Sequence, residues 1–514
     1  GFDDFTLMLC DLTGAAMGDI LLFLPLLAMP LVGFFLPFIK NPRIRTAYGL
    51  FFGILAGSFS YRTSYIWTLL SQVITWVILK MPFKNKGLAA FMFNIAFLGT
   101  FTTCRYYFTD LFFKVVPSDH WLSMQMIMFL AMTSVGFDCH DSGSKPPGLF
   151  EFLAFANWFT HILVGPFVPF KEWRKFIHTS GSPTSHIRRI ANMVKYYLWT
   201  IVSLAVYTVW TAPGTFGLPN VGSYTDLYLN SGLCDDMSLL MKILIVSGGV
   251  LTLRHRYYLC WNGAHVALVA TAEAWDEKEK NYTKWLNIRV SKVELAPNAS
   301  QLTRYWNAGT SYWLATYIYK RSFNWMKSKG IKAGPAKTLA VLITDVVSAL
   351  WHGPYPPFLV FFVWCALLTF ANRAVATVFQ AMLYAMSQSA SKATVKWGKV
   401  LYKVYYVCGV ICVHTGLAHM ASMFSYGDVK VWVRTLKFLH YYPVWQLLAA
   451  VPLVMLGKLK PVRKMIVTHK AYLKEEREAK KALKAKAQAE AKAEAEAAPD
   501  AKESVSSETK AKAE

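Results

Sequence analysis

Charged residues are scarce in this sequence, and acidic residues are the scarcest. Asp, Glu, Lys and Arg together make up 16% of the 514 residues, whereas 54% of the residues are apolar. A water-soluble chain of this length needs far more charge to cover its surface. Helix surfaces that face lipid need no charge, so the deficit excludes an ordinary soluble enzyme and favours an integral membrane protein.

Motifs of soluble enzymes and of metal sites are also missing. The sequence contains no G-x-S-x-G elbow and no H-E-x-x-H, and its eight cysteines are scattered. Cys408, Cys412 and His414 come closest to a metal motif, but they lie in a hydrophobic run where Cys behaves as a small apolar residue. We therefore expect no metal site and no structural disulfides.

Apolar runs long enough to cross a bilayer recur along the chain. Residues 20–39 carry no charge and can span about 30 Å of hydrocarbon. We expect about eleven crossings, and hence an all-α, polytopic transmembrane helical bundle. The further runs lie near 46–80 (two crossings), 88–104, 120–136, 150–165, 194–212, 238–253, 256–275, 337–352, 354–386, 398–420 and 441–457.

Three regions follow from these runs. Residues 1–19 form an N-terminal segment, residues 20–460 the membrane body, and residues 461–514 a tail dominated by Ala, Lys and Glu. The tail has high helix propensity from Lys470 to Ala498 but few apolar residues, which predicts a solvated helix that becomes disordered after Pro499. The absence of an internal repeat argues against a transporter built from two related halves.

The net charge of +24 suggests a nucleic-acid partner, but the distribution of the charge argues against one. Lys and Arg collect in short segments beside apolar runs, as in cytosolic loops that obey the positive-inside rule. The same residues suit anionic lipid head groups. These segments contain Lys171, Arg174 and Lys175; Arg188, Arg189 and Lys195; Lys392, Lys396, Lys399 and Lys403; and Lys458, Lys460, Arg463 and Lys464.

A polar stripe ends the apolar run near 337–352. Asp345, Ser348 and His352 are separated by three and four residues, so they share one helical face before Gly353 and Pro354 end the helix. A carboxylate in mid-membrane costs on the order of 3 kcal/mol, so the stripe faces protein or a water-filled cavity. It is a candidate catalytic site, and a buried structural network is the alternative.

Other polar residues in apolar surroundings are weaker candidates. Asn262, His265 and Glu273 form a second stripe, and His161 precedes a Gly-Pro-Phe sequence. Most intramembrane histidines of this kind make hydrogen-bonded helix contacts. After a long polar interruption at 273–303, an amphipathic segment returns and predicts either a cavity lining or a surface brace. At helical spacing its shared face contains Trp306, Thr310, Trp313, Tyr317 and Lys320.

Four motifs follow one another along the chain: Gly165-Pro166-Phe167; Arg256-Tyr257-Tyr258 with Trp261 and the Trp285-Leu-Asn-Ile-Arg289 stretch; Arg304-Tyr-Trp306-Asn307; and Ser348-Ala-Leu-Trp351-His352-Gly353. In this order the motifs resemble the membrane-bound O-acyltransferase family, and within it the lysophospholipid acyltransferase branch. The resemblance covers roughly residues 150–420. In the stretch after the signature His, the chain departs from the branch with Pro354-Tyr-Pro356-Pro357, which leaves the acyl acceptor open.

This resemblance implies a catalytic pair, His352 and Asn307, in a reaction chamber inside the bilayer. It implies a multi-pass protein of the endoplasmic reticulum membrane with a cytosolic tail. Acyl-CoA is the expected co-substrate, a lysophospholipid the expected acceptor, and no cofactor is expected to be bound permanently; a homodimer is left open. Around the pair we expect Ser348, Asp345, Trp306 and Trp351 to support the site, and Lys320, Arg321, Trp313 and Tyr317 to bind substrate.

Elementary chemistry is consistent with this pair. Esterifying a hydroxyl with a thioester requires a general base near neutral pH, for which His is suited. The Asn side chain is suited either to donate a hydrogen bond to the developing oxyanion or to hold the acceptor hydroxyl. Two alternatives remain: a member of the same family that acylates a diacylglycerol, a sterol or a protein, and a transporter or channel.

Overall fold

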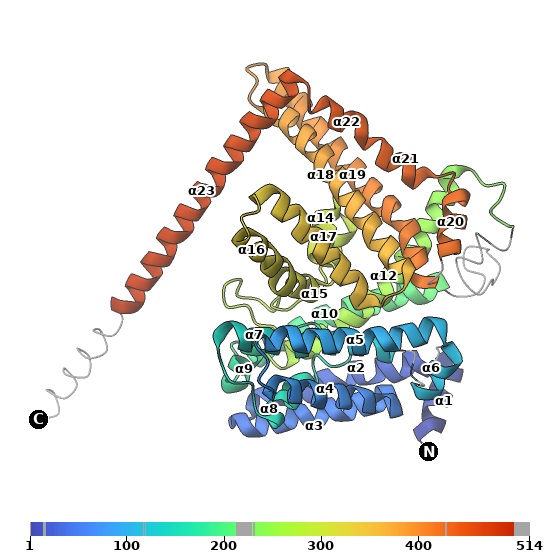
Figure 1. The fold of residues 1–514 in the computed structure, drawn as a ribbon, viewed down its shortest axis with the longest axis vertical. Coiled ribbons are helices and arrows are strands. Elements are labelled where there is room, and N and C mark those ends of the chain that lie inside the picture. Colours follow the sequence, from blue (N-terminus) through green and yellow to red (C-terminus); the bar gives the residue numbers. More distant parts are fainter. Residues whose placement is uncertain are drawn as a thin grey trace, which may run out of the picture. The chain divides into compact units, whose positions relative to one another are not determined.

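The computed structural model describes residues 2–13, 17–116, 118, 120–211, 229, 232–426 and 429–497. These residues form α-helices, two short 3-10 helices (η1 and η2) and one π-helix (η4) (Figure 1), and their only β-bridge is an isolated one between Asp276 and Asn281. The all-α class expected from the sequence is confirmed. Disorder after Pro499 was expected for residues that lie outside the described part of the chain.

The helices of the first half of the chain are mostly long and apolar. They are α1 (Phe2–Thr13), α2 (Met17–Phe35), η1 (Leu36–Phe38), α3 (Pro42–Tyr61), η2 (Arg62–Ser64), α4 (Tyr65–Lys80), α5 (Lys86–Tyr107), α6 (Thr109–Val115), α7 (Trp121–Ser142), α8 (Leu149–Ala156), α9 (Phe170–His178), α10 (His186–Thr211) and α12 (Leu239–Ala270).

In the second half, short helices precede three long ones. They are α13 (Val290–Glu294), α14 (Ala299–Tyr305), α15 (Ala308–Trp313), the π-helix η4 (Leu314–Tyr319), α16 (Lys320–Ser328), α17 (Ala333–His352), α18 (Pro356–Ser387), α19 (Lys392–Tyr426), α20 (Val429–Phe438), α21 (Tyr442–Leu448), α22 (Ala450–Leu456) and α23 (Lys460–Ala497).

Several helices begin where the sequence supplies a capping side chain. The side-chain oxygens of Asn41, Asn85 and Asn298 each accept a hydrogen bond of 2.9 Å from a backbone N–H in the first turn of α3, α5 and α14. Ser238 caps α12 in the same way. These bonds satisfy N–H groups that have no partner within the helix, so the helix starts are encoded locally.

Six described helical segments are long and apolar enough to cross a membrane: Met17–Phe38, α5, α7, α17, α18 and Lys392–Leu417 of α19. A seventh is added if Val429–Phe438 and Tyr442–Leu456, which meet at 81°, form one bent span. The chain is thus a multi-pass membrane protein, but the expected count of about eleven crossings is not confirmed.

Four of the expected crossings take other forms in the structure. The runs near 238–253 and 256–275 form one continuous helix, α12, which carries Arg254 and Arg256 at its middle. The run near 150–165 is only the eight-residue α8 followed by turns, and α4 has 16 residues. Hydropathy alone does not distinguish a span from an apolar segment that is buried inside protein.

The chain divides into two compact units. Unit 1 contains Gly1–Thr369 and Val407–Gln446, and unit 2 contains Phe370–Tyr406 and Leu447–Glu514. The boundaries that the sequence suggested, after residues 19 and 460, remain predictions. All of the residues expected at the catalytic site lie in unit 1.

In unit 1, the helices α2, α3, α4, α5 and α7 lie side by side (Figure 1), and α12 packs between α2 and α10. Small residues permit this close approach, as is usual between membrane helices. At Gly53 of α3, a Cβ atom would lie 1.6 Å from the backbone oxygen of Asn157, so only glycine fits. The close packing gives the elements that carry the site a rigid support.

Candidate catalytic site

His352 is the last residue of α17, as the polar stripe predicted. Gly353 ends the helix with φ 120° and lies against α5, where a Cβ atom would be 1.9 Å from Thr102 Cγ2. The imidazole is half-buried, and its ring centroid lies 5.6 Å from that of Phe358 and 5.4 Å from that of Phe362. The end of α17 therefore places His352 among aromatic rings rather than in open solvent.

Trp351 is buried and anchors the same helix end to α7. Its indole Nε1 donates a hydrogen bond of 2.9 Å to the backbone oxygen of Met126. Trp351 shares one buried cluster with Phe167 of the Gly-Pro-Phe motif and with Trp313 and Tyr317. Packing thus brings together three motifs that are widely separated in the sequence.

Asn307 lies in the turn between α14 and α15, in the left-handed backbone conformation (φ 46°, ψ 54°). Asn287 accepts two hydrogen bonds that hold the residues after Asn307. The Asn287 backbone oxygen accepts from Ala308 N and its side-chain Oδ1 accepts from Gly309 N, both at 2.9 Å. Asn287 is almost fully buried, so this clamp on the Asn307 turn is shielded from water.

The Gly-Pro-Phe loop closes against the same turn. A Cβ atom at Gly309 would lie 2.9 Å from the backbone nitrogen of Phe167, closer than real Cβ atoms approach other atoms. The Phe167 ring also lies 6.4 Å from that of Tyr312. Glycine at position 309 is therefore a requirement of this contact between two distant segments.

Trp306, the neighbour of Asn307, is surrounded by aromatic side chains of α12. Its ring centroid lies 5.5 Å from that of Tyr257, 5.9 Å from that of Tyr258 and 5.1 Å from that of Trp261. The Tyr-Tyr and Trp-Asn motifs therefore pack directly on each other, which adds stacking energy to the burial of apolar area.

Beside this cluster, Glu294 ties α13 to α12. Both of its carboxylate oxygens accept hydrogen bonds of 2.9 Å from the Arg254 guanidinium, and the Tyr258 hydroxyl donates to one of them. Burial alone would raise the pKa of Glu294, but the charge of Arg254 and these hydrogen bonds hold it below its usual value. Glu294 therefore stays ionised and fixes the segment that leads to Asn307.

Aromatic side chains lie beside both catalytic candidates. Next to His352, the Phe358 ring packs on Tyr106 of α5, with 5.6 Å between the two ring centroids. Next to Asn307, the Trp306 ring packs on Tyr257 of α12. His352 and the Asn307 turn thus each border aromatic side chains of unit 1, and we call these side chains together the aromatic wall.

The expected supporting residues lie on the inner side of α17. Ser348 is buried, and Asp345 is half-buried. The geometry is compatible with a stripe that faces protein. That either residue orients the His352 imidazole stays a prediction.

The expected substrate-binding residues make contacts that hold η4 and α16 against α7. Tyr317 donates a hydrogen bond of 2.9 Å to Asp138, and Arg321 pairs with Asp141 and lies over the Phe137 ring. Trp313 is fully buried, whereas Lys320 is exposed. The π-helix at 314–319 shifts the helical phase, so Lys320 does not share the buried face of Trp313. Substrate binding by these residues stays a prediction.

The weaker histidine candidates make structural contacts. His265 Nε2 lies 2.9 Å from the backbone oxygen of Tyr282, and His161 Nε2 lies 2.9 Å from a carboxylate oxygen of Glu273. Glu273 also accepts hydrogen bonds from Trp158 Nε1 (3.3 Å) and Thr160 Oγ1 (3.0 Å). Buried ionisable groups of this kind pair with one another inside membrane proteins.

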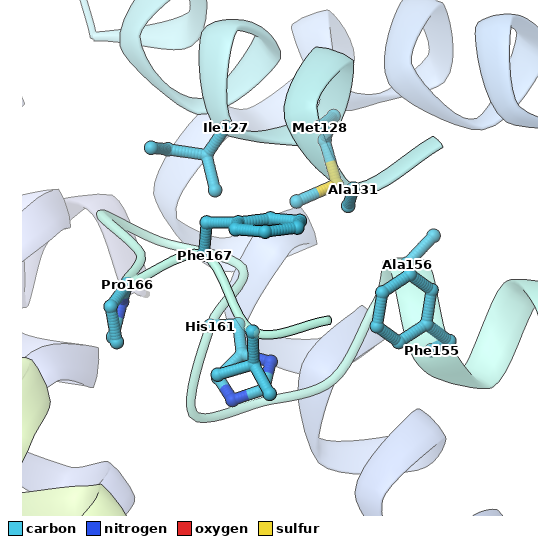
Figure 2. Close-up of a pocket in the computed structure, with 9 residues that line it drawn as sticks. Ile127, Met128, Ala131, Phe155, Ala156, His161, Pro166 and Phe167 are labelled. Atoms are coloured by element: carbon cyan, nitrogen blue, oxygen red, sulfur yellow. The ribbon is translucent and has the colours of Figure 1, made fainter. Parts of the chain in front are cut away.

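A small pocket lies beside His161. Figure 2 shows the Phe167 ring between α7 side chains and His161, and the lining is mostly apolar. The space suffices for about one water molecule, so it is no chamber for a lipid substrate. Within the described ranges, no three His, Cys, Asp or Glu side chains are placed to hold a metal ion.

Sequence reasoning did not single out Asn287 or Glu294. Asn287 lies inside the Trp285-Leu-Asn-Ile-Arg289 stretch, and Glu294 lies in the polar interruption. The only signal in the sequence was that both residues lie in the long polar interruption at 273–303. Their roles depend on partners 21 to 40 residues away, which the local pattern does not reveal.

Comparison with known proteins supports the motif assignment. The model of the MBOAT, membrane-bound O-acyltransferase family, matches residues 55–414. "Lysophospholipid acyltransferase" of Schizosaccharomyces pombe is 22% identical over 465 residues, which are 82% of this chain and 84% of that protein. "Lysophospholipid acyltransferase 5" of Drosophila melanogaster is 23% identical over 349 residues, 63% of this chain and 65% of that protein.

A higher identity is confined to a shorter stretch of the chain. "Lysophospholipid acyltransferase 2" of Arabidopsis thaliana is 34% identical over 130 residues, which are 24% of this chain. The match spans about a quarter of that relative, 26% of its length.

Proposed function

We propose that this chain, which belongs to the membrane-bound O-acyltransferase family, transfers an acyl group to the free hydroxyl of a lysophospholipid. Its family was expected from the motifs and is confirmed. The observation that carries the proposal is that Phe167 joins the Trp-His-Gly end of α17 to the turn after Asn307, because it shares a buried cluster with Trp351 and lies against Gly309. The similarity to proteins named lysophospholipid acyltransferases supports the choice of acceptor.

In the proposed reaction, His352 is the general base. Its imidazole takes the proton of the lysolipid hydroxyl as that oxygen attacks the thioester carbonyl of acyl-CoA. The Asn307 amide donates a hydrogen bond to the carbonyl oxygen as negative charge develops on it. The carbon–sulfur bond then breaks, and the proton passes to the leaving thiolate to give the ester and free CoA. A positioned base contributes about 10²–10⁴-fold to such a rate.

The surroundings suit two substrates that carry long acyl chains. An apolar, aromatic wall beside His352 excludes water and favours the acyl chain, which strengthens hydrogen bonds to a developing oxyanion. We assign the exposed Lys320 to the phosphates of CoA, with acyl-CoA arriving from the cytosol and the lysolipid from the bilayer. We further assign the chain to the endoplasmic reticulum membrane with its C-terminal tail in the cytosol.

The proposal is tested by acyl transfer from labelled oleoyl-CoA with the purified chain in detergent. The acceptor panel contains lysophospholipids of different head groups, a diacylglycerol and a sterol. We expect label in a diacyl phospholipid. Label only in a triacylglycerol or a sterol ester would establish another acceptor, and no ester from any acceptor, together with solute flux in liposomes, would establish a transporter.

Asn287→Ala is expected to lower the turnover number about 10–100-fold. The substitution removes the side-chain acceptor of Gly309 N, so the left-handed turn at Asn307 loses half of its clamp and the amide is misplaced. Losing a buried hydrogen bond also costs about 1–3 kcal/mol of stability. Steady-state rates and the thermal midpoint are measured together.

Asn192→Ala is the matched control for this clamp. Asn192 is half-buried on α10, and its amide only donates an exposed hydrogen bond to the backbone oxygen of Arg188 one turn earlier. We expect both its turnover and its thermal midpoint to remain at the wild-type level. Wild-type turnover in Asn287→Ala would show that the clamp does not position Asn307.

A further inference from the structure

Two segments of unit 2 carry positive charge and no negative charge. Residues 370–406 and 447–474 together hold eleven Lys and Arg and no Asp or Glu. The proposed acyl transfer uses none of them. Positive charges without compensating carboxylates produce a field that attracts polyanions and repels other cations, which indicates an interaction surface.

Eight of these cations form two exposed groups. In α19, Lys392, Lys396, Lys399 and Lys403 follow each other at steps of four, three and four, which places them on one helical face. The second group lies at the start of α23 and just before it, and it contains Lys458, Lys460, Arg463 and Lys464. All eight side chains are exposed, and we call these eight residues the basic face.

Packing within unit 2 brings both groups to the same end of α18. The start of α19 lies against Met386, because a Cβ atom at Gly398 would be 3.2 Å from Met386 Cβ. On α23, the rings of His469 and Tyr472 lie 5.2 Å and 4.9 Å from that of Tyr384. Next to the second group, a Cβ atom at Gly457 would lie 3.1 Å from Val378 Cγ2, so both groups lie beside the C-terminal part of α18.

In the remainder of α23, lysines are paired with glutamates. There, Lys474 lies 3.9 Å from Glu478 and Lys486 lies 3.9 Å from Glu490, and Lys480 pairs with Glu476. These pairs one turn apart neutralise each other along the helix. In the part of the chain that the structure describes, no ion pair includes a residue of the basic face, so its charges are available to an external anion.

The position of the basic face indicates which kind of anion it binds. It lies where two candidate membrane spans, Pro356–Ser387 and Lys392–Leu417, meet at a four-residue connection. Trp397 and Tyr402, which are 64% and 54% exposed, lie on the same helix, and exposed aromatic residues are typical of the membrane–water interface. Phosphates at this level belong to lipid head groups.

We propose that the basic face binds anionic phospholipid head groups of the surrounding bilayer. Several lysines and an arginine give charge-assisted hydrogen bonds to phosphate oxygens, and the apolar spans beside them hold the acyl chains of the same lipid. A nucleic acid could bind the positive charges, but it has no acyl chains to pack against the apolar spans. The interaction does not depend on acyl transfer, because no residue of the basic face lies in unit 1.

The test compares the intact wild-type chain with the K392Q/K396Q/K399Q variant in mild detergent. Each chain is titrated with dioctanoyl phosphatidylinositol bisphosphate and with dioctanoyl phosphatidylcholine, and bound lipid is counted by native mass spectrometry. One Lys near an anionic surface is worth about five-fold in affinity, so three substitutions are expected to weaken anionic-lipid binding on the order of 100-fold. Phosphatidylcholine binding should not change.

The K474Q/K480Q/K486Q variant is the matched control, since it removes the same charge from the paired part of α23. We expect it to bind the anionic lipid within about three-fold of wild type, since its lysines are already paired. Equal losses in both variants, or an unchanged affinity in the α19 variant with a wild-type thermal midpoint, would overturn the proposal. So would tighter binding of a single-stranded oligonucleotide than of the lipid.

Discussion

His352→Ala is expected to abolish acyl transfer and to leave the fold intact. The residue ends α17, so its side chain is not needed to continue the helix, and Gly353 still ends it. Removing the general base lowers the turnover number about 10²–10⁴-fold. Labelled oleoyl-CoA and the preferred lysophospholipid give the rate, and the thermal midpoint in detergent reports the fold.

The loss should be specific to this histidine. His178 is exposed at the end of α9, and His178→Ala is expected to keep the wild-type rate and midpoint. If His352→Ala retained more than about a tenth of the wild-type rate, the loss would be far below that expected for a general base. The base would then have to be sought elsewhere on the aromatic wall.

Asn307→Gly is expected to lower the turnover number about 10²–10³-fold, the effect typical of removing one oxyanion donor. Glycine is the informative substitution because Asn307 has φ 46°. Alanine at this position would add about 1–2 kcal/mol of backbone strain, whereas glycine adopts the conformation freely. Asn307→Gly therefore removes the amide and leaves the turn in place.

Rates measured against acyl-CoA concentration separate two roles of this amide. A donor that acts only in the transition state lowers kcat and leaves KM for acyl-CoA nearly unchanged. A large rise in KM with an unchanged kcat would instead make Asn307 a binding residue. Asn298→Ala serves as the control, because its side chain caps α14 and its loss is expected to affect stability rather than turnover.

Much of the architecture could be predicted from the sequence because it depends on local properties. Apolar runs without charge predict helices in a bilayer, where every backbone group must bond within its own segment. Capping residues such as Asn41 and Asn85 mark helix starts for the same local reason. Gly353 and Pro354 likewise predicted the helix end after His352 that the structure contains.

The number of crossings could not be predicted in the same way. An apolar run buried against other helices and an apolar run exposed to lipid have the same composition, and only packing separates them. Thus α8 is short and buried where a span was expected, and α12 is one continuous helix with two arginines at its middle. Arg254 is tolerated there because Glu294, 40 residues away, compensates its charge.

The sequence by itself determined the helical membrane fold, the family and the two catalytic candidates, since each depends on residues that are neighbours in the chain. Only the tertiary structure decided which residues hold those candidates in place. The clamp of Asn287 on the Asn307 turn and the contact of Gly309 with Phe167 join segments far apart in the sequence. Such contacts follow from how helices pack, and no local pattern encodes them.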